Sequence, residues 1–404
     1  MLQIASKASI LKGDLKILSN LHKPAIICTY GIGENALGIA RSLGRKNIPV
    51  ILVTVKGSLN VSVHSKYCSI IIEITEFSRD SILNEIVFLS QQIKDKPVLF
   101  FDNCKMVNLF HKDKELLKQY CFITQGIGDF TDKTYQFEMV ANANVAVPKT
   151  WKPESWNEYN TQIITKKKLI SKPDFASGKK PFKLLIADDP IQLKSQLEKY
   201  VNTPAGLLIQ EYIDGDQKNV WVALGYTSPI SRGTHIMTAI KYLMNPNYGG
   251  VMAIGRVIDN EEVRKASIKL LESFNYEGIF GFEFKYSPKD DCYYYIEMSP
   301  RTEGFHNITT LAGFDLPLMA YKDIYVESVG KGKSYYGSYW VNARYTVDSL
   351  IGSRSILDLL RTLKVILIAR EWQQFAWDDL KPFIRGTKWY LDKLAKKVLK
   401  KIKQ

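Results

Sequence analysis

The sequence predicts a mixed α/β and α+β protein with two successive units and a basic C-terminal extension. Between residues 24 and 128, short apolar runs alternate with helical patterns, which is typical of a parallel sheet with crossover helices. Between residues 279 and 299, two alternating segments flank a turn-forming run and predict an antiparallel hairpin. The last seventeen residues hold seven lysines and one aspartate, a composition unlike that of either unit.

At 404 residues, the chain is long enough for two or three domains with substantial cores. Its five cysteines are scattered and never form a CxxC pair, so we expect reduced thiols and neither disulfides nor a zinc site. The longest apolar runs are too short to cross a bilayer, and the N-terminus lacks the apolar core of a signal peptide. The predicted localisation is therefore cytoplasmic.

The formal charge of +14 is the one unusual bulk property. Such an excess favours an anionic partner, for example a nucleotide, a nucleic acid, an acidic glycan or a membrane surface. Nearly half of it lies in residues 388–404. Because these lysines are not interleaved with aromatic residues on a recognisable recognition element, a nucleic-acid-binding protein is the disfavoured alternative.

The first unit is expected to follow a loosely attached leader, residues 1–23. Strands are predicted over residues 24–30, 48–55, 70–74 and 98–101, and helices up to residue 45 and over residues 80–94 and 109–120. After the first strand, Gly31, Gly33 and Gly38 have GxGxxxxG spacing, which misses the dinucleotide-binding fingerprint. We expect these glycines to allow tight packing of the helix on the strand, with NAD binding as the disfavoured alternative.

A second unit begins with a helix predicted over residues 130–145, with Thr131 as its N-cap. Lys133 lies near the start of this helix, and Lys172 lies at the end of a later strand. Each lysine alone is typical of a solvated side chain. A further strand is predicted over residues 207–213 and ends in an Asp-Gly turn.

The predicted hairpin carries the clearest chemical signal. Its phenylalanines alternate onto one face and place Glu283 on the other, where the returning strand sets Tyr295 or Glu297 opposite. Two facing carboxylates repel each other, so a cation is expected between them, and a divalent metal with oxygen ligands is the simplest candidate. The alternative is a pair of edge carboxylates neutralised by Lys285 and Arg301.

Five short motifs follow one another along the chain. They are Asp132-Lys133, Ile170–Pro173, Gln210–Gly215, Gly281–Tyr286 and Ile296–Arg301. Together they resemble the motifs of the ATP-grasp superfamily of carboxylate–amine ligases, over residues 24–318. Within it, the chain looks closest to D-aspartate-ligase-like proteins, a link that rests partly on Phe375–Ile384.

The resemblance implies a Rossmann-like (pre-ATP-grasp) domain followed by a two-lobed ATP-grasp domain. The implied boundaries are a leader (1–23), the Rossmann-like domain (24–128), the small lobe with its linker helix (129–215), the large lobe with the metal site (216–335), the C-terminal completion of the fold (336–387) and a basic amphipathic helix (388–404).

The resemblance also implies which residues bind ATP. Lys133 and Lys172 match two lysines that hold the phosphates. The positions implied for adenine and ribose are Gln210, Glu211, Tyr212, Ile213 and Asp216, with Asp214 as the alternative to Asp216. Backbone edges are implied for Gln210 to Ile213, and carboxylate contacts for the acidic residues.

The same resemblance implies a metal site. Glu283 and Glu297 match the ligands of Mg²⁺, for which Mn²⁺ is the alternative. The third ligand is normally an asparagine, and here that position is Ser299, a weaker oxygen ligand. Arg301 matches the arginine that faces the transferred phosphate, and His306 is the candidate base for the acceptor.

The implied phosphate loop, residues 175–183, has one glycine where many family members have a glycine-rich run. Lysines in this loop are expected to supply charge instead. The missing glycine-rich lid also disfavours a biotin-dependent carboxylase.

The implied reaction has two steps. ATP phosphorylates a substrate carboxylate, and an amine then attacks the acyl phosphate to give an amide, ADP and phosphate. The expected partners are ATP, a carboxylate that is a small molecule or lipid-linked (an amino acid or a cell-envelope precursor), and an amine. No nucleic acid is expected, a homo-oligomer is left open, and transfer of the activated carboxylate to another acceptor is the alternative.

The C-terminal segment is predicted to contain a strand over residues 339–346, an apolar helix over residues 356–369 and a basic helix over residues 388–404. The basic helix has an apolar stripe flanked by lysines, which is typical of a helix on an anionic membrane surface. A solvated helix packed on the domain by that stripe is an equal alternative. The membrane interpretation would place the protein at the inner face of the membrane and fit a lipid-linked substrate.

Overall fold

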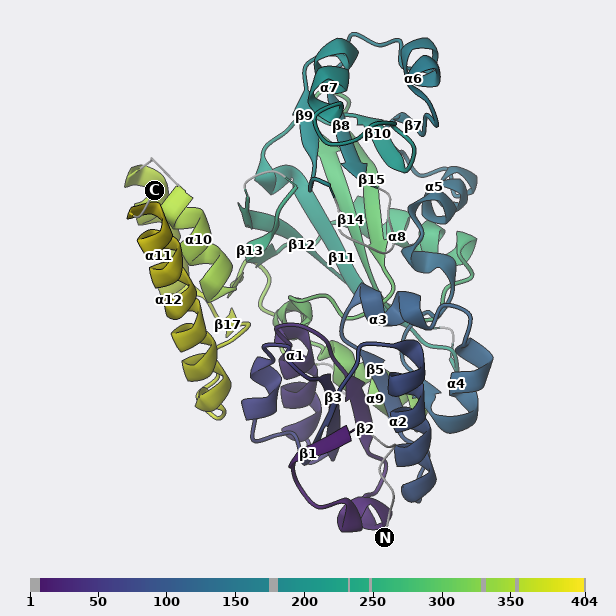
Figure 1. The fold of residues 1–404 in the computed structure, drawn as a ribbon, viewed down its shortest axis with the longest axis vertical. Helices are drawn as coiled ribbons and strands as arrows, with labels where there is room; N and C mark the ends of the chain where they lie inside the picture. Colours follow the sequence, from purple (N-terminus) through teal and green to yellow (C-terminus); the bar gives the residue numbers. More distant parts are fainter. Residues whose placement is uncertain are drawn as a thin grey trace.

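A computed structural model describes residues 8–173, 181–231, 233–246, 249–327, 332–352 and 356–402 (Figure 1). Its N-terminal unit contains a six-stranded sheet of order β1-β4-β3-β2-β5-β6. The strands are β1 (Ala8–Lys12), β2 (Ala25–Cys28), β3 (Val50–Val55), β4 (Ile70–Ile74), β5 (Val98–Phe101) and β6 (Phe122–Ile123). Strands β2 to β6 are parallel, as the alternation of strands and helices predicted.

Helices cover both faces of this sheet. They are α1 (Glu34–Gly44), α2 (Arg79–Gln92), α3 (Cys104–Leu109) and α4 (Lys114–Tyr120). Alternate residues of β2 face opposite ways, so Ile27 packs in the same core as α1 and Ile26 in the same core as α2. Two buried faces explain why these strands are almost entirely apolar.

Residues 8–20 belong to this unit, and the prediction of a loosely attached leader was wrong for them. β1 pairs antiparallel with β4, and the 3₁₀ helix η1 (Leu15–Asn20) buries Leu15 and Leu18 in the core. An edge strand is held mainly by backbone hydrogen bonds, which leave little trace in the sequence. Residues 1–7 lie outside the described residues.

A second, antiparallel sheet has the order β7-β10-β8-β9. Its strands are β7 (Thr150–Trp151), β8 (Leu169–Pro173), β9 (Leu185–Ala187) and β10 (Leu207–Glu211), and its helices are α6 (Trp156–Gln162) and α7 (Pro190–Leu197). The helix α5 (Lys133–Asn142) precedes them in the chain. The N-cap of α5 is Asp132, whose carboxylate accepts from the Tyr135 amide, and not the expected Thr131. Residues 175–180 of the implied phosphate loop lie outside the described residues.

The third sheet is seven-stranded, with the order β15-β14-β11-β12-β13-β16-β17. Its elements are β11 (Val220–Thr227), β12 (Thr234–Asn245), β13 (Val251–Val257), α8 (Glu261–Ser273), β14 (Gly278–Ser287), β15 (Cys292–Ser299), β16 (Tyr339–Val341) and β17 (Glu371–Trp372). Phe280, Phe282 and Phe284 of β14 share a buried cluster with α8. The predicted alternation of this hairpin is therefore confirmed.

Three helices close the chain: α10 (Ala343–Gly352), α11 (Ile356–Ile368) and α12 (Leu380–Ile402). The strand expected over residues 339–346 ends early, because the Asn342 side chain accepts from the Tyr345 amide at the start of α10. In Figure 1 the three helices run along one edge of the molecule. Among the described residues, no helix has both the length and the apolarity needed to cross a bilayer.

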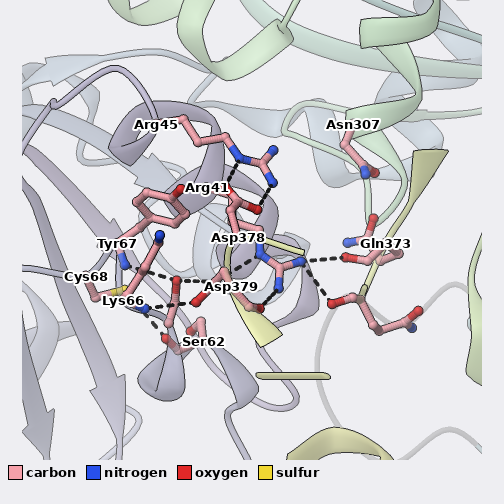
Figure 2. A network of polar contacts seen from close by, with 12 residues as sticks. Arg41, Arg45, Ser62, Lys66, Tyr67, Cys68, Asn307, Gln373, Asp378 and Asp379 are labelled. Atoms are coloured by element: carbon pink, nitrogen blue, oxygen red, sulfur yellow. Dashed lines mark hydrogen bonds and ion pairs between the residues drawn. The ribbon is translucent and has the colours of Figure 1, made fainter. Parts of the chain in front are cut away.

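Two contacts of the N-terminal unit with the rest of the chain lie away from the cavity described below. First, α9 (Leu316–Ile324) packs in the same apolar core as α1 and β2. Second, the segment before α12 is anchored to α1 (Figure 2). There the buried Arg41 pairs with Asp379 at 3.0 Å, and the more exposed Arg45 pairs with Asp378 at 2.9 Å.

The segment Phe375–Ile384, matched at the sequence level, therefore tethers the C-terminal helices to the N-terminal unit. Asp379 also accepts from the Ser65 hydroxyl and the Lys66 amide. The predicted fold class, a Rossmann-like unit followed by a two-lobed α+β domain and a C-terminal extension, is confirmed. The exact domain boundaries stay predictions.

Candidate active site

A cavity of about 880 Å³ is lined by residues of the second and third sheets and by loop and α1 residues of the N-terminal unit. It is large enough for a nucleotide and a second substrate. It brings together eleven of the twelve predicted site residues. These are Lys133, Lys172, Gln210, Glu211, Tyr212, Ile213, Asp216, Glu283, Glu297, Ser299 and Arg301. The exception is His306.

The hairpin β14–β15 places the predicted carboxylates face to face. Of the two registers that the sequence left open, the structure has Glu283 opposite Glu297, and it has Ser299 opposite Gly281. A bulge directly after the glutamate pair shifts the register, a feature common beside active sites. Three side chains with oxygen atoms that could bind a metal, those of Glu283, Glu297 and Ser299, therefore lie on neighbouring strands at the cavity wall.

The cation beside these carboxylates is a lysine that the sequence analysis missed. Lys241 of β12 is only 3% exposed and forms an ion pair with Glu283. Burial raises the pKa of Glu283, against the opposing effect of Lys241. Burial also disfavours the charge of Glu297, but Lys133 and Lys172, among other cations, bring its pKa below the ordinary value. Surrounding charge thus keeps Glu297 ionised.

The oxygen donors of the hairpin fit a magnesium site. Carboxylates and a hydroxyl are hard ligands of the kind that Mg²⁺ binds. Among the residues that the structure describes, no group of three or more His, Cys, Asp or Glu side chains could hold a metal. Mg²⁺ is commonly bound by one or two carboxylates, with waters and substrate phosphate oxygens as its other ligands.

Further lysines line the cavity near the carboxylates. Lys133 is the first residue of α5, while Lys172 lies on β8 opposite Leu208. Burial, followed by repulsion from Lys133, lowers the pKa of Lys172 to about 8. Burial and the nearby Lys241 likewise lower the pKa of Lys183. Cations crowded in this way favour a polyanionic ligand.

The strand predicted to contact adenine lines the cavity, but not in the way expected. β10 is an interior strand between β7 and β8, so the backbone of Gln210 lies within the ladder and is not an edge. The strand ends at Glu211, whose carboxylate accepts from Lys167 at 2.6 Å. Tyr212 and Ile213 continue beyond it along the cavity wall. The prediction that Gln210 offers a free backbone edge to adenine is wrong. The sequence does not show that β10 has a partner strand on each side.

Asp216 lies at the cavity rim, where its carboxylate forms a capping box with Asn219 at the start of η4 (Gln217–Asn219). Lys285 donates to the carbonyl oxygens of Gly215 and Asp216, at 2.8 and 2.7 Å. Burial lowers the pKa of Lys285 to about 8. This lysine therefore orders the loop after β10, and it does not neutralise the glutamate pair.

Arg301 lies where the hairpin meets the N-terminal unit. Its Nε donates to the Cys104 Sγ at 3.0 Å, and its Nη1 lies 3.3 Å from the Glu303 carboxylate. Burial opposes its charge, but Cys104 and Glu303 raise the pKa of Arg301 above the ordinary value. The guanidinium is thus a permanent cation at the cavity wall.

His306 is the predicted site residue that the structure places elsewhere. It is buried against α1, where a Cβ at Gly38 would lie 2.5 Å from its Cε1. Its Nδ1 is 2.9 Å from the Glu303 carbonyl oxygen, and burial lowers the pKa of His306 to about 4. The role of acceptor base is therefore not supported. Gly38 permits close packing as expected, but against this histidine and not against a strand.

The other end of the cavity is built by the N-terminal unit and α10. Gly33 adopts φ +70 as the N-cap of α1 and leads into Glu34. The Glu34 carboxylate lies 3.2 Å from Arg344 and accepts from Asn342 at 3.4 Å. Asp102, at the end of β5, also lines this end, and burial raises its pKa to about 6. Polar groups of both signs here suit a polar second substrate.

A family model described as an ATP-grasp domain matches residues 130–305. Residues 130–305 form an ATP-grasp domain. The match contains the lysines, the strand and the hairpin described above. The prediction of an ATP-grasp enzyme is thereby confirmed. A search of curated protein sequences gives no match.

Solved structures resemble the chain beyond the ATP-grasp domain. N5-carboxyaminoimidazole synthetase from Staphylococcus aureus, complexed with ADP, has a TM-score of 0.60 at 16% identity, over 77% of this chain and 80% of that one. The biotin carboxylase domain of Hydrogenobacter thermophilus 2-oxoglutarate carboxylase has a TM-score of 0.60 at 14% identity, covering 79% and 73%. L-amino acid ligase from Bacillus licheniformis has a TM-score of 0.56 at 12% identity, covering 75% of each chain. At these identities the likeness shows the fold alone.

The residues that the sequence analysis missed are mostly supplied by segments outside the ATP-grasp motifs. Lys241 stands in the apolar strand run TAIKYLM, where a single charge among buried neighbours is a usable signal. Asp102, in contrast, could be expected from the sequence, because it follows a predicted parallel strand, a position that commonly faces a ligand cleft. Glu34 and Arg344 are 310 positions apart, so their pairing is visible only in three dimensions.

Proposed function

We propose that this chain is an ATP-dependent carboxylate–amine ligase that forms an amide bond through an acyl phosphate, with Mg²⁺ or Mn²⁺ as its metal. The observation that carries the proposal is the pair Glu283 and Glu297 facing each other in a cavity that Lys133, Lys172 and Arg301 also line. Facing carboxylates among cations suit a metal-bound polyphosphate and have little use in a purely structural site.

ATP would lie between the two lobes. Tyr212 and Ile213 line the wall expected to contact adenine, and the Glu211 carboxylate is available to a ribose hydroxyl once Lys167 moves. Lys133 and Lys172 would bind the phosphates. Charge neutralisation and alignment are the main contributions that a protein makes to phosphoryl transfer.

Glu283, Glu297 and Ser299 would hold the metal, which neutralises phosphate charge when it is bound. Arg301, whose guanidinium lines the cavity and is held by Cys104 and Glu303, would stabilise the oxygens of the transferred phosphoryl group and of the acyl phosphate. The substrate carboxylate would enter beside Arg301.

The second substrate would occupy the end of the cavity lined by Glu34 and Asp102. An amino acid or a cell-envelope precursor, free or lipid-linked, presents the mixed charges that this end could pair with. The amine would attack the acyl carbon, with phosphate as the leaving group. Asp102, which lines the cavity and whose carboxyl has a raised pKa, replaces His306 as the candidate to accept the proton.

The test is a panel of amino acids and envelope precursors incubated with ATP and Mg²⁺, scored by ADP release and by mass spectrometry of products. Hydroxylamine added in place of the amine should trap an acyl phosphate as a hydroxamate. Glu297→Ala should abolish substrate-dependent ADP release at saturating Mg²⁺, whereas Glu272→Ala, at an exposed position of α8, should leave it unchanged.

Two outcomes would count against this proposal. Unchanged turnover in Glu297→Ala would remove the metal assignment. Hydroxamate formation without any amide product across the amine panel would favour transfer of the activated carboxylate to another acceptor.

A further inference from the structure

The helix α11 exposes an apolar stripe that nothing in the described chain covers. Ile356, Leu360, Leu363 and Leu367 recur at the i, i+4, i+7 and i+11 spacing of one helix face, and their exposed fractions run from 44% to 85%. The residues that α11 buries, Thr362 and Val365, lie on the opposite face. The helix is thus attached by one side and apolar on the other.

This arrangement is not the ordinary scatter of apolar residues on a protein surface. A four-residue stripe spans three helical turns, and Leu357 and Ile368 beside it are also exposed. Trp377, which is 82% exposed, follows in the segment before α12. A contiguous apolar surface of this kind is typical of a site that binds a protein or a membrane.

The charge around the stripe distinguishes between these occupants. Residues 356–402 hold eleven lysines and arginines against five aspartates and glutamates. Three of the five acids are already paired with residues outside this segment. Asp379 is buried against Arg41, the partly exposed Asp378 pairs with Arg45, and Glu371 accepts from Asn307. The outward charge of this segment is therefore more positive than its composition alone indicates.

We propose that α11 and α12 form a docking surface for an anionic lipid bilayer. The stripe of α11 enters the boundary between headgroups and acyl chains, and the basic side chains of α11 and α12, among them Arg361, Lys364 and Lys388, contact the anionic headgroups. A second copy of this chain is the less suitable occupant, because a two-fold interface would bring two basic segments together. The docking surface is separate from the ATP-binding cavity and does not depend on the proposed reaction.

The docking surface differs in one respect from the membrane contact expected from the sequence. The sequence placed membrane contact in residues 388–404 alone, but α12 starts at Leu380 and its Tyr390 donates to Asp348 of α10 at 2.6 Å. That contact holds α12 against the body of the protein. The apolar part of the surface is therefore supplied mainly by α11, and α12 contributes charge.

The experiment uses the full chain and vesicles of phosphatidylcholine with or without phosphatidylglycerol, in a sedimentation assay without nucleotide. The unmodified protein should sediment with anionic vesicles and much less with neutral ones, and added salt should weaken binding. The double variant Leu363→Gln/Leu367→Gln should lower the partition coefficient about tenfold or more, because two apolar side chains no longer enter the bilayer.

The control is Ile164→Gln/Ile191→Gln, which changes two exposed apolar residues of the small lobe. It should bind vesicles like the unmodified protein. All of the substituted residues are exposed, so the variants should fold, and circular dichroism checks this. Equal binding to neutral and anionic vesicles, or no binding by the unmodified protein, would overturn the proposal.

The oligomeric state supplies a second, independent readout. Sedimentation velocity of the unmodified protein and of Leu363→Gln/Leu367→Gln should give the same mass. A dimer that the double variant converts to a monomer would show that α11 is a self-association face, and the membrane proposal would then be wrong.

Discussion

Lys241 of β12 and Glu283 of β14 form a buried ion pair at the wall of the ATP-grasp cavity, with β11 lying between their strands. Glu297 lies directly across the hairpin from the same glutamate. A lysine thus neutralises a carboxylate that the proposed metal would also bind. Lys241 and the metal are therefore expected to compete for Glu283.

Lys241→Gln should therefore have two opposite effects. Mg²⁺ should stabilise the protein at lower concentration, because Glu283 no longer has a competing partner. ADP formation should fall by about ten- to a hundredfold, because the cavity loses a cation near the phosphates. Thermal shift against Mg²⁺ and ADP release measure these two effects separately. Lys265→Gln, at an exposed position of α8, is the control, and a Mg²⁺ response equal to that of the control would contradict the competition.

The lowered pKa of Lys172 predicts that ATP binding depends on pH. Its folded-state pKa of about 8 is below the ordinary value of 10.5 for lysine, so the empty site loses this charge as pH rises through about 8. ATP affinity should then fall between about pH 7 and pH 9. In Lys172→Arg the side chain stays charged over this range, so the fall should disappear. Calorimetric titration with ATP and Mg²⁺ at both pH values is the measurement, and an equal fall in both proteins would exclude Lys172 as its source.

The glutamate hairpin could be predicted from the sequence because alternation and turn residues are local properties. The pairing of Lys241 with Glu283 could not, since it depends on the sheet order β14-β11-β12. His306 was misjudged for a related reason. A histidine in a predicted loop is usually solvated. Here Gly38 of α1 has no side chain, so His306 can pack directly against the helix. Long-range packing, not local propensity, decided both cases.

The adjacent residues Asp378 and Asp379 allow a matched comparison of an exposed and a buried ion pair. Arg41 and Asp379 have side chains 5% and 2% exposed, whereas Arg45 and Asp378 are 43% and 39% exposed. Asp379→Ala leaves Arg41 buried without its carboxylate and should lower the free energy of unfolding by about 3–5 kcal/mol. Asp378→Ala should cost about 0–1 kcal/mol. Urea unfolding measures both, and equal losses would show that burial does not govern this anchor.

The burial of Glu85 in α2 predicts that the N-terminal unit is less stable at alkaline pH. Its side chain is fully buried, and within the described part of the chain no group hydrogen-bonds to either carboxylate oxygen. Burial raises the pKa of Glu85 from 4.5 to about 7. The folded protein therefore holds this proton more tightly than the unfolded chain does. The contribution of Glu85 to the free energy of unfolding should be most favourable below about pH 4.5, and this contribution should be lost as pH rises through about 7.

Glu85→Met removes the buried charge and keeps an unbranched side chain of similar size. It should raise the free energy of unfolding by about 1–3 kcal/mol at about pH 8, and the difference from the unmodified protein should shrink towards about pH 5. Glu76→Met, at an exposed position, is the control and should show no such pH dependence. Urea unfolding at the two pH values decides the matter. A gain in Glu85→Met that is the same at both values would mean that it comes from packing, and that the charge of Glu85 carries no cost.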